Sequence, residues 1–401
     1  MGYRNDPRDR GRKNFRHGKK ETANFSNGKK HTAKGLAPES FIRKAVPAAV
    51  TAYRAERLIQ ELPVHGSIIS NLRKKGYEKP TEIQDKTLEA ILEGRNLIGL
   101  AQTGTGKTGA FLIPLVHNLL RKDASGQVLV ISPTRELALQ TDSEFRSIAF
   151  GLKLFSTCLI GGTSVRRDID RLRKPGQIII GTPGRLADMV RQGALDLGRF
   201  TILVLDEFDR LLDMGFAPEI NRLVDGMSRR MQTILFSATE DRSQQKIIGD
   251  LVQDPYIVRV RPDNVSADNI DQDIVTVKDG EKKIDLLLDM VRDDSFEKVL
   301  VFADTKRGVS RICRDLRRAG ITADEIHGDK SQNYRVKALE SFRNRKIKVL
   351  VATDVAARGL DISHVSHVIN FQQPKDMESY IHRIGRTGRA GAGGKAITFI
   401  N

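Results

Sequence analysis

The sequence predicts an α/β fold of two domains, each a mostly parallel sheet with helices on both faces. Short runs of Val, Ile and Leu recur along the chain and alternate with longer stretches of helical apolar spacing. Such alternation is typical of βαβ units, whose central strands are buried on both faces. A polar stretch at 261–269 interrupts the alternation once, and the 401 residues are enough for two domains.

The expected elements follow in chain order. Residues 1–40 are interpreted as a disordered basic arm, 41–260 as the first domain, 261–269 as the linker and 270–401 as the second domain. Strands are expected at 96–100, 128–132, 154–158, 177–180, 202–205, 233–236 and 255–260, and then at 299–302, 323–326, 349–352, 367–370 and 396–399. Residues 41–60 have some helical character, and 109–116 have helical apolar spacing.

The charge of the chain points to a polyanionic partner. The formal net charge is +17, and residues 1–40 hold 11 Lys and Arg against 4 Asp and Glu. The arm is interpreted as a tail that contacts RNA, with an organellar address or a cloning remnant as open alternatives. Two distant cysteines argue against zinc and favour a reduced, cytoplasmic setting, with organellar or nuclear settings left open. The sequence contains no run of 18 apolar residues, so no membrane span is expected.

The segment Ala101–Thr108 combines a preceding apolar run, a Gly-rich turn and Gly-Lys-Thr before a helical pattern. This order predicts a phosphate-binding loop, in which glycines let successive N–H groups point at one anion. Lys107 is expected to reach the β- and γ-phosphates, and Thr108 to bind Mg²⁺ through its hydroxyl. The alternative is a tight glycine turn between a strand and a helix.

A second apolar run ends in Asp206-Glu207-Phe208-Asp209. Two carboxylates at the end of a buried strand are costly to desolvate unless a cation or a reacting water is present. Asp206 is therefore expected to help bind Mg²⁺, and Glu207 to orient and deprotonate the attacking water. The alternative is a loop of solvated acids.

From about residue 62 onward, the motifs resemble those of the DEAD-box ATP-dependent RNA helicases of helicase superfamily two. Residues 76–84, 133–138, 161–162, 182–185, 237–239, 302–305, 327–335, 352–361 and 382–389 stand in the order and spacing of that family. The resemblance implies two RecA-like domains, ATP and Mg²⁺ as cofactors, RNA bound with little sequence preference, and a monomer. It also implies an RNA-stimulated ATPase that remodels RNA duplexes and ribonucleoproteins.

The resemblance assigns roles to individual residues. ATP contacts fall on Tyr77, Gln84, Thr103, Gly104, Thr105, Gly106, Lys107, Thr108 and Asp361, and Gln84 can pair with an adenine edge. RNA contacts fall on Pro133, Thr134, Arg135, Gly162, Thr182, Pro183, Arg185, Thr305, Arg335, Thr353 and Asp354. Coupling of hydrolysis to strand separation falls on Asp209, Ser237, Thr239 and His382, and the arginine fingers are Arg386 and Arg389.

The sequence departs from the family pattern at three places. Phe208 stands where the family has Ala, Ile59 aligns with a position that is usually aromatic, and the chain ends one strand after the arginine-finger motif. Ile59 is expected to weaken stacking on adenine, and Phe208 to change local packing. Two other activities remain to be weighed: an ATP-gated RNA clamp that unwinds little, and a DNA translocase, which the residue 76–84 motif disfavours.

Overall fold

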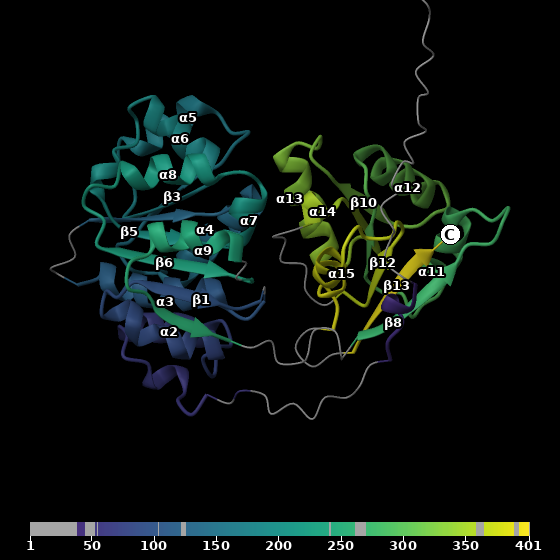
Figure 1. Cartoon of the computed structure of the whole chain (residues 1–401), viewed down its shortest axis with the longest axis horizontal. Coiled ribbons are helices and arrows are strands. Elements are labelled where there is room, and N and C mark those ends of the chain that lie inside the picture. The colour runs from purple at the N-terminus through teal and green to yellow at the C-terminus, as the bar shows by residue number, and fades with distance from the viewer. Residues whose placement is uncertain are drawn as a thin grey trace, which may run out of the picture. The chain divides into compact units, whose positions relative to one another are not determined.

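The computed structural model describes residues 38–44, 53, 55–102, 104–121, 126–239, 242–260, 270–357, 365–388 and 393–400. The strands in these ranges form two sheets, each with helices packed against it (Figure 1). The expected arm lies outside the described residues except for 38–40, and the expected linker lies wholly outside them. None of the described helices has both the length and the apolar character needed to cross a membrane.

The first lobe contains a seven-stranded sheet with the order β3-β4-β2-β5-β6-β1-β7, and every adjacent pair is parallel. Its strands are β1 (Leu97–Leu100), β2 (Gln127–Ile131), β3 (Ser156–Leu159), β4 (Ile178–Gly181), β5 (Phe200–Leu205), β6 (Gln232–Ser237) and β7 (Tyr256–Arg259). Its helices are η2 (Ile59–Glu61), α1 (Gly66–Lys74), α2 (Glu82–Leu92), α3 (Lys107–Leu119), α4 (Arg135–Ile148), α5 (Val165–Leu172), α6 (Pro183–Arg191), η3 (Leu197–Arg199), α7 (Phe208–Asp213), α8 (Ala217–Asp225) and α9 (Arg242–Leu251).

The second lobe contains a six-stranded parallel sheet with the order β10-β11-β9-β12-β13-β8. Its strands are β8 (Ile270–Thr276), β9 (Val299–Phe302), β10 (Ala323–Ile326), β11 (Val349–Ala352), β12 (His367–Asn370) and β13 (Gly394–Ile400). Its helices are α11 (Lys283–Arg292), α12 (Lys306–Arg318), α13 (Gln332–Arg343), α14 (Asp354–Ala357) and α15 (Met377–Ile384). The expected strands are confirmed within a few residues at their ends, and β8 is an additional strand that the sequence analysis did not identify.

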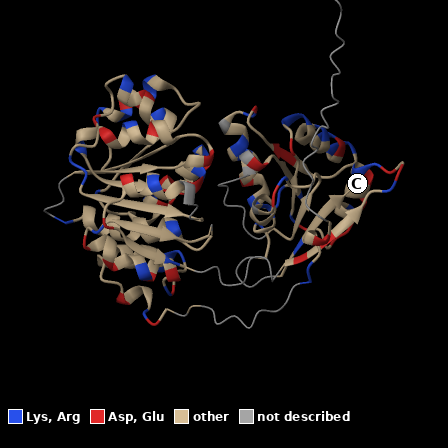
Figure 2. Cartoon of the chain, viewed as in Figure 1, with Lys and Arg blue, Asp and Glu red and all other residues tan. Residues whose placement is uncertain are grey.

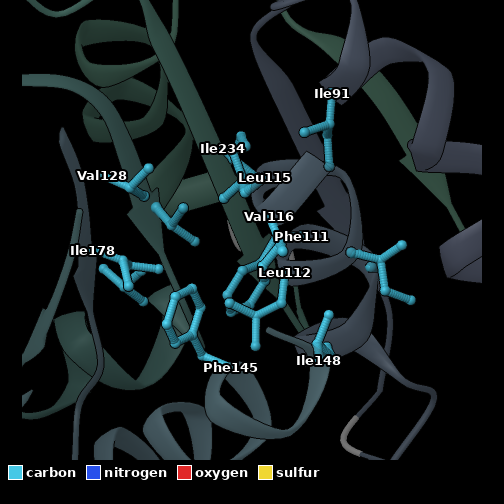
Figure 3. Packing of buried hydrophobic residues seen from close by; sticks show 14 of the residues in the cluster. Ile91, Phe111, Leu112, Leu115, Val116, Val128, Phe145, Ile148, Ile178 and Ile234 are labelled. Atoms are coloured by element: carbon cyan, nitrogen blue, oxygen red, sulfur yellow. The ribbon is translucent and has the colours of Figure 1, made fainter. Parts of the chain in front are cut away.

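Alternating residues of each strand of the first sheet supply its two faces. In β2, Val128 and Val130 belong to one apolar cluster, while Leu129 and Ile131 belong to the other. Figure 3 shows the first cluster, in which Phe111 of α3 lies among the aliphatic side chains of the sheet and the neighbouring helices. Because both faces are covered, the strands read as continuous apolar runs. Charged residues lie mainly on helices and loops rather than on strands (Figure 2).

Parallel pairing brings the carboxyl ends of all strands of one lobe to the same edge of its sheet. Ligands of open α/β sheets bind outside this edge. In the first lobe the loop after β1, the acids after β5 and the residues after β6 therefore converge, although they are far apart in the sequence.

The start of the expected first domain packs against the second lobe. The sequence analysis began the first domain at residue 41, but Phe41 packs with Ile270 and Tyr380 of the second lobe. The preceding helix η1 (Pro38–Phe41) thus lies on the second sheet. A single aromatic in a polar segment gives no periodic signal, so its tertiary partner could not be read from the sequence.

Candidate active site and nucleic-acid interface

The turn between β1 and α3 has the backbone of a phosphate-binding loop. Gly104 and Gly106 have φ angles of 92° and 96°, a left-handed conformation that favours glycine. The Lys107 amine, 6% exposed, donates a hydrogen bond to the Ala101 carbonyl oxygen at 2.7 Å, so it points back into the turn. Thr108 lies in the first turn of α3 and is partly exposed, whereas Thr103 lies outside the described residues.

Gln84 connects the start of α2 to this loop. Its Oε1 accepts a hydrogen bond from the Thr81 N–H at 3.0 Å, and its Nε2 donates to the Gly106 carbonyl oxygen at 3.1 Å. An added Cβ at Gly106 or Gly109 would lie 2.7 Å from Gln84 Nε2. The amide retains one N–H and one lone pair, which is what pairing with an adenine edge needs.

Tyr77 contacts α4 and the core of the first lobe. Its hydroxyl donates to the Glu144 carboxylate of α4 at 3.3 Å, and its ring packs against the first apolar cluster. Burial, together with the Glu144 carboxylate, raises the pKa of Tyr77 to about 12. The described contacts of Tyr77 therefore join α4 to the segment before α2.

The acids after β5 are buried and electrostatically distinct. Asp206 is 2% exposed, and its Oδ2 has no hydrogen-bond partner. Burial and the neighbouring Glu207 carboxylate raise the pKa of Asp206 to about 7. Burial also acts to raise the pKa of Glu207, but the Arg210 guanidinium and the Lys107 amine outweigh it and hold that pKa below its ordinary value. Glu207 is thus ionised at neutral pH, as a general base must be.

The backbone explains how Glu207 reaches this position. Its φ of 48° and ψ of 57° place it in the left-handed region, where a non-glycine residue is uncommon. The turn ends β5 and starts α7 directly, and Glu207 pairs with Arg210 one helical turn later. Such local strain persists only where the surrounding structure fixes it, which is common at active sites.

The residues present suit Mg²⁺ bound together with phosphate oxygens. The unpartnered, buried Oδ2 of Asp206 is an oxygen ligand without a proton donor, and the Thr108 hydroxyl is a second candidate ligand. The described residues contain no cluster of three His, Cys, Asp or Glu side chains that would form a complete metal cage. Mg²⁺ usually takes one or two protein ligands, water and substrate phosphates, which is the set that this site can supply.

Asp209 links the acids to the end of β6. Its Oδ2 accepts hydrogen bonds from the Ala238 N–H at 3.1 Å and the Thr239 hydroxyl at 3.3 Å. The Ser237 hydroxyl donates to the Thr239 carbonyl oxygen at 2.7 Å. A shift of α7 would therefore be transmitted to residues 237–239 through one carboxylate.

The expected RNA-contacting residues of the first lobe form two groups. Pro133 is buried, and Thr134 caps α4 by accepting a hydrogen bond from the Leu137 N–H at 3.2 Å. The Arg135 guanidinium lies so close to Gly162 that an added Cβ there would be 2.5 Å from Nη1. The structure thus brings together an arginine and a glycine that are 27 positions apart in the sequence.

The second group is centred on the start of α6. Thr182 and Pro183 begin the helix and are buried, as is Arg185. Arg185 donates to the buried Asp168 carboxylate at 3.0 Å and to the Thr163 carbonyl oxygen at 2.8 Å. Its guanidinium therefore fixes the loop before α5.

In the second lobe, helix starts hold most of the expected RNA-contacting residues. Thr305 caps α12 by accepting a hydrogen bond from the Gly308 N–H at 3.0 Å. Arg335 lies in α13 with 14% of its side chain exposed. Thr353 is buried after β11, and Asp354 begins α14.

Arg383 is a site residue that the sequence analysis missed. It is 2% exposed, and it donates to both carboxylate oxygens of Asp354 at 2.6 and 2.7 Å. It also donates to the Gln372 carbonyl oxygen at 2.8 Å and packs on the Phe302 ring. The signal in the sequence that could have identified Arg383 was its position between two apolar residues, Tyr380 and Ile384, which are both buried. Of the other residues in this motif, His382 is partly exposed and Arg386 is buried, while Arg389 and Asp361 lie outside the described residues.

The departures at Phe208 and Ile59 are accommodated in the apolar core. Phe208 is fully buried in the cluster beneath α7, and Ile59 is 1% exposed in the cluster of α2 and α3.

A phosphate-binding loop and paired buried acids at one edge of a parallel sheet define a phosphate-loop nucleotide hydrolase.

Comparisons with known proteins identify the family. The DEAD/DEAH box helicase family matches residues 81–247, and the helicase conserved C-terminal domain matches residues 282–391. ATP-dependent RNA helicase CshA of Listeria monocytogenes is 43% identical over 340 residues, which cover 85% of this chain and 65% of that protein. DEAD-box ATP-dependent RNA helicase CshA of Geobacillus kaustophilus is 42% identical over 341 residues, which cover 85% of this chain and 73% of that protein.

Solved structures agree. The structure of S. cerevisiae Dbp5 bound to RNA and ADP BeF3 matches with a TM-score of 0.76 at 30% identity, over 86% of this chain and 89% of that one. The chain therefore belongs to the DEAD-box ATP-dependent RNA helicases, and its two lobes are RecA-like.

Proposed function

We propose that this protein hydrolyses ATP when RNA is bound and uses ATP binding and hydrolysis to open or remodel short RNA duplexes and ribonucleoproteins. The observation that carries the proposal is the buried pair of Asp206 and Glu207, two carboxyl groups on which the positive charge of Lys107 acts to lower the pKa. One acid retains an unpartnered oxygen and the other is held ionised, which are the two states that metal binding and base catalysis need.

In the proposed reaction, the Lys107 amine exchanges the Ala101 carbonyl oxygen for phosphate oxygens. The N–H groups at the start of α3 bind the same anion, since the N-terminus of a helix attracts negative charge. Glu207 accepts a proton from the attacking water. When bound at Thr108 and Asp206, Mg²⁺ supplies positive charge to the phosphates. Arg386 and Arg389 are assigned to the charge that develops during transfer, where arginine fingers contribute roughly 10³–10⁵ in rate.

RNA is proposed to bind through its phosphates and sugars rather than its base edges. Threonine hydroxyls at helix starts, the Gly162 backbone and Arg135 are suited to phosphate contacts, which carry no sequence information. The positive net charge supports the same partner. The two cysteines are unpaired, which is consistent with a reducing compartment such as the cytoplasm.

Strand separation tests the proposal against a clamp that holds RNA without opening it. A short RNA duplex with a single-stranded overhang should be separated by the wild type with ATP, and not without ATP. Glu207→Gln keeps the shape of the side chain and removes the base, so ATP binding should persist while turnover falls by at least about 10²-fold.

The same variant supplies the control. If the duplex remains intact in the presence of wild-type protein and ATP while RNA stays tightly bound, the clamp replaces the proposal. If Glu207→Gln hydrolyses ATP at the wild-type rate, the proposed catalytic base is wrong.

A further inference from the structure

A short segment that precedes the first lobe is attached to the second lobe. Residues 38–43, named here the docking segment, lie against β8. The Arg43 N–H donates to the Gln272 carbonyl oxygen at 3.0 Å, and the Gln272 N–H donates to the Arg43 carbonyl oxygen at 2.8 Å. These two bonds form an antiparallel bridge. Because β8 is the edge strand of its sheet, the docking segment uses main-chain groups that the sheet leaves open.

Phe41 anchors the docking segment. Its side chain is completely buried among Ile270, Tyr380, Ile384 and Ala396. The rings of Phe41 and Tyr380 meet edge to face, with centroids 4.8 Å apart and an interplanar angle of 69°. This is a favourable geometry for an aromatic pair.

The pocket for Phe41 is built from the second lobe's own interactions. The Tyr380 hydroxyl donates to the Gln272 side-chain oxygen at 3.0 Å. Gln272 therefore holds the main chain of the docking segment with its backbone and holds the wall of the pocket with its side chain. Tyr380 and Ile384 lie on α15, the helix that also places Arg383. Ile42, the next residue after the anchor, is 52% exposed, so its side chain does not enter the pocket.

Ten residues later the same chain is bound to the first lobe. Tyr53 and Arg57 both pair with Asp85 of α2, and Arg57 also pairs with Glu89 at 3.2 Å. Ile59 then enters the core of the first lobe. The chain therefore passes from one lobe to the other between residues 44 and 53, which can span at most about 30 Å.

We infer that the docking segment is a second link between the lobes: residues 44–53 join them on the N-terminal side, and residues 261–269 join them on the other. The N-terminal link ends in a non-covalent anchor, so it holds the second lobe only while Phe41 is seated. A tether of this length gives the docking segment an effective concentration in the millimolar range at its site on the second lobe. The inference concerns attachment of the lobes and does not depend on the proposed activity.

Cutting the other link, in the protein of 401 residues, tests this inference. A protease site is inserted within residues 261–269, the protein is cut, and the two fragments are analysed by size-exclusion chromatography at low micromolar concentration. With the docking segment intact, the fragments should elute together. Phe41→Ala should weaken their association at least tenfold, so that they elute separately. Ile42→Ala, which changes the adjacent exposed side chain, should behave as the unsubstituted protein.

A second pair of variants tests the main-chain bridge without altering the pocket. Arg43→Pro removes the N–H that bonds to Gln272, whereas Arg43→Ala retains it. Arg43→Pro should weaken the association more than Arg43→Ala does. Hydrogen exchange of β9 and β11 in the cut Phe41→Ala protein should remain slow, which would show that the second lobe is still folded.

Three outcomes would overturn the inference. The first is that the fragments separate while the docking segment is intact, and the second is that they stay together in Phe41→Ala. The third is that β9 and β11 lose protection in Phe41→Ala, because the segment would then be part of the lobe's folding core rather than a link.

Discussion

Replacing Gly109 by Ala should destabilise the first lobe, although the same change stabilises most helices. Gly109 lies in α3, and an added Cβ would approach Gln84 Nε2 to 2.7 Å. The Gln84 amide would have to move, which would break its hydrogen bonds to the Thr81 N–H and the Gly106 carbonyl oxygen.

The two effects have opposite signs and can be compared. Each of the two hydrogen bonds contributes about 0.5–1.5 kcal/mol, so their loss costs about 1–3 kcal/mol. Ala in place of Gly in a helix gains up to about 1 kcal/mol. Gly109→Ala should therefore lower the free energy of unfolding by about 1 kcal/mol, or roughly 2–4 °C in Tm for a lobe of this size.

Removing the obstructing side chain should reverse the sign. In a Gln84→Ala background, Gly109→Ala has nothing to displace and should stabilise by about 0.5–1 kcal/mol. Gly249 in α9 has open space around its Cβ position, so Gly249→Ala should stabilise by a similar amount in both backgrounds. Thermal unfolding of the four combinations measures the effect. The reasoning fails if Gly109→Ala stabilises the protein with Gln84 present as much as Gly249→Ala does.

Three further predictions follow from other groups. Without nucleotide, the pKa of Asp206 is about 7 in the folded protein and about 3.9 in the unfolded chain, so the free energy of unfolding should fall as the pH rises between these values. The Tm of Asp206→Asn should therefore exceed that of the wild type by more at pH 8 than at pH 5, and a constant difference in Tm would contradict a buried, protonated Asp206. Arg383→Ala should destabilise the second lobe by about 2–4 kcal/mol in urea unfolding, because it leaves Asp354 without its partner. The control Arg311→Ala changes a side chain that is 77% exposed and should cost less than about 0.5 kcal/mol, so equal losses in the two variants would refute the role of Arg383. Deleting residues 1–37, which spares the docking segment, should weaken RNA binding at low salt and flatten log affinity against log salt by roughly 0.7 for each lost phosphate contact, with turnover at saturating RNA unchanged; an unaltered slope would show that the arm does not bind RNA.

The sequence was most informative for strands that are buried on both faces of the sheet. Strands such as β9 and β11 are covered on both faces, so they appear as continuous apolar runs and were located correctly. β8 was missed because it is an edge strand with three consecutive polar residues, Asp271, Gln272 and Asp273, and within it only Ile270 and Gln272 are buried. An edge strand of this kind resembles a loop in composition.

The candidate site shows the same division. Motif spacing located Lys107, Asp206 and Glu207, because a phosphate-binding loop and metal-binding acids require particular residue types next to strand ends. Motif spacing could not tell which arginine is buried. Arg185, which is expected to contact RNA, is buried and pairs with Asp168, and Arg383, which was not selected from the sequence, pairs with Asp354. These choices depend on tertiary partners that a linear pattern does not contain.

In the proposed function, RNA binding and ATP hydrolysis are coupled in this chain. Steady-state ATP turnover should be measured without nucleic acid, with saturating single-stranded RNA and with single-stranded DNA of the same sequence. We expect slow turnover without nucleic acid and with DNA, and at least tenfold faster turnover with RNA. Turnover that is equal under all three conditions would contradict it.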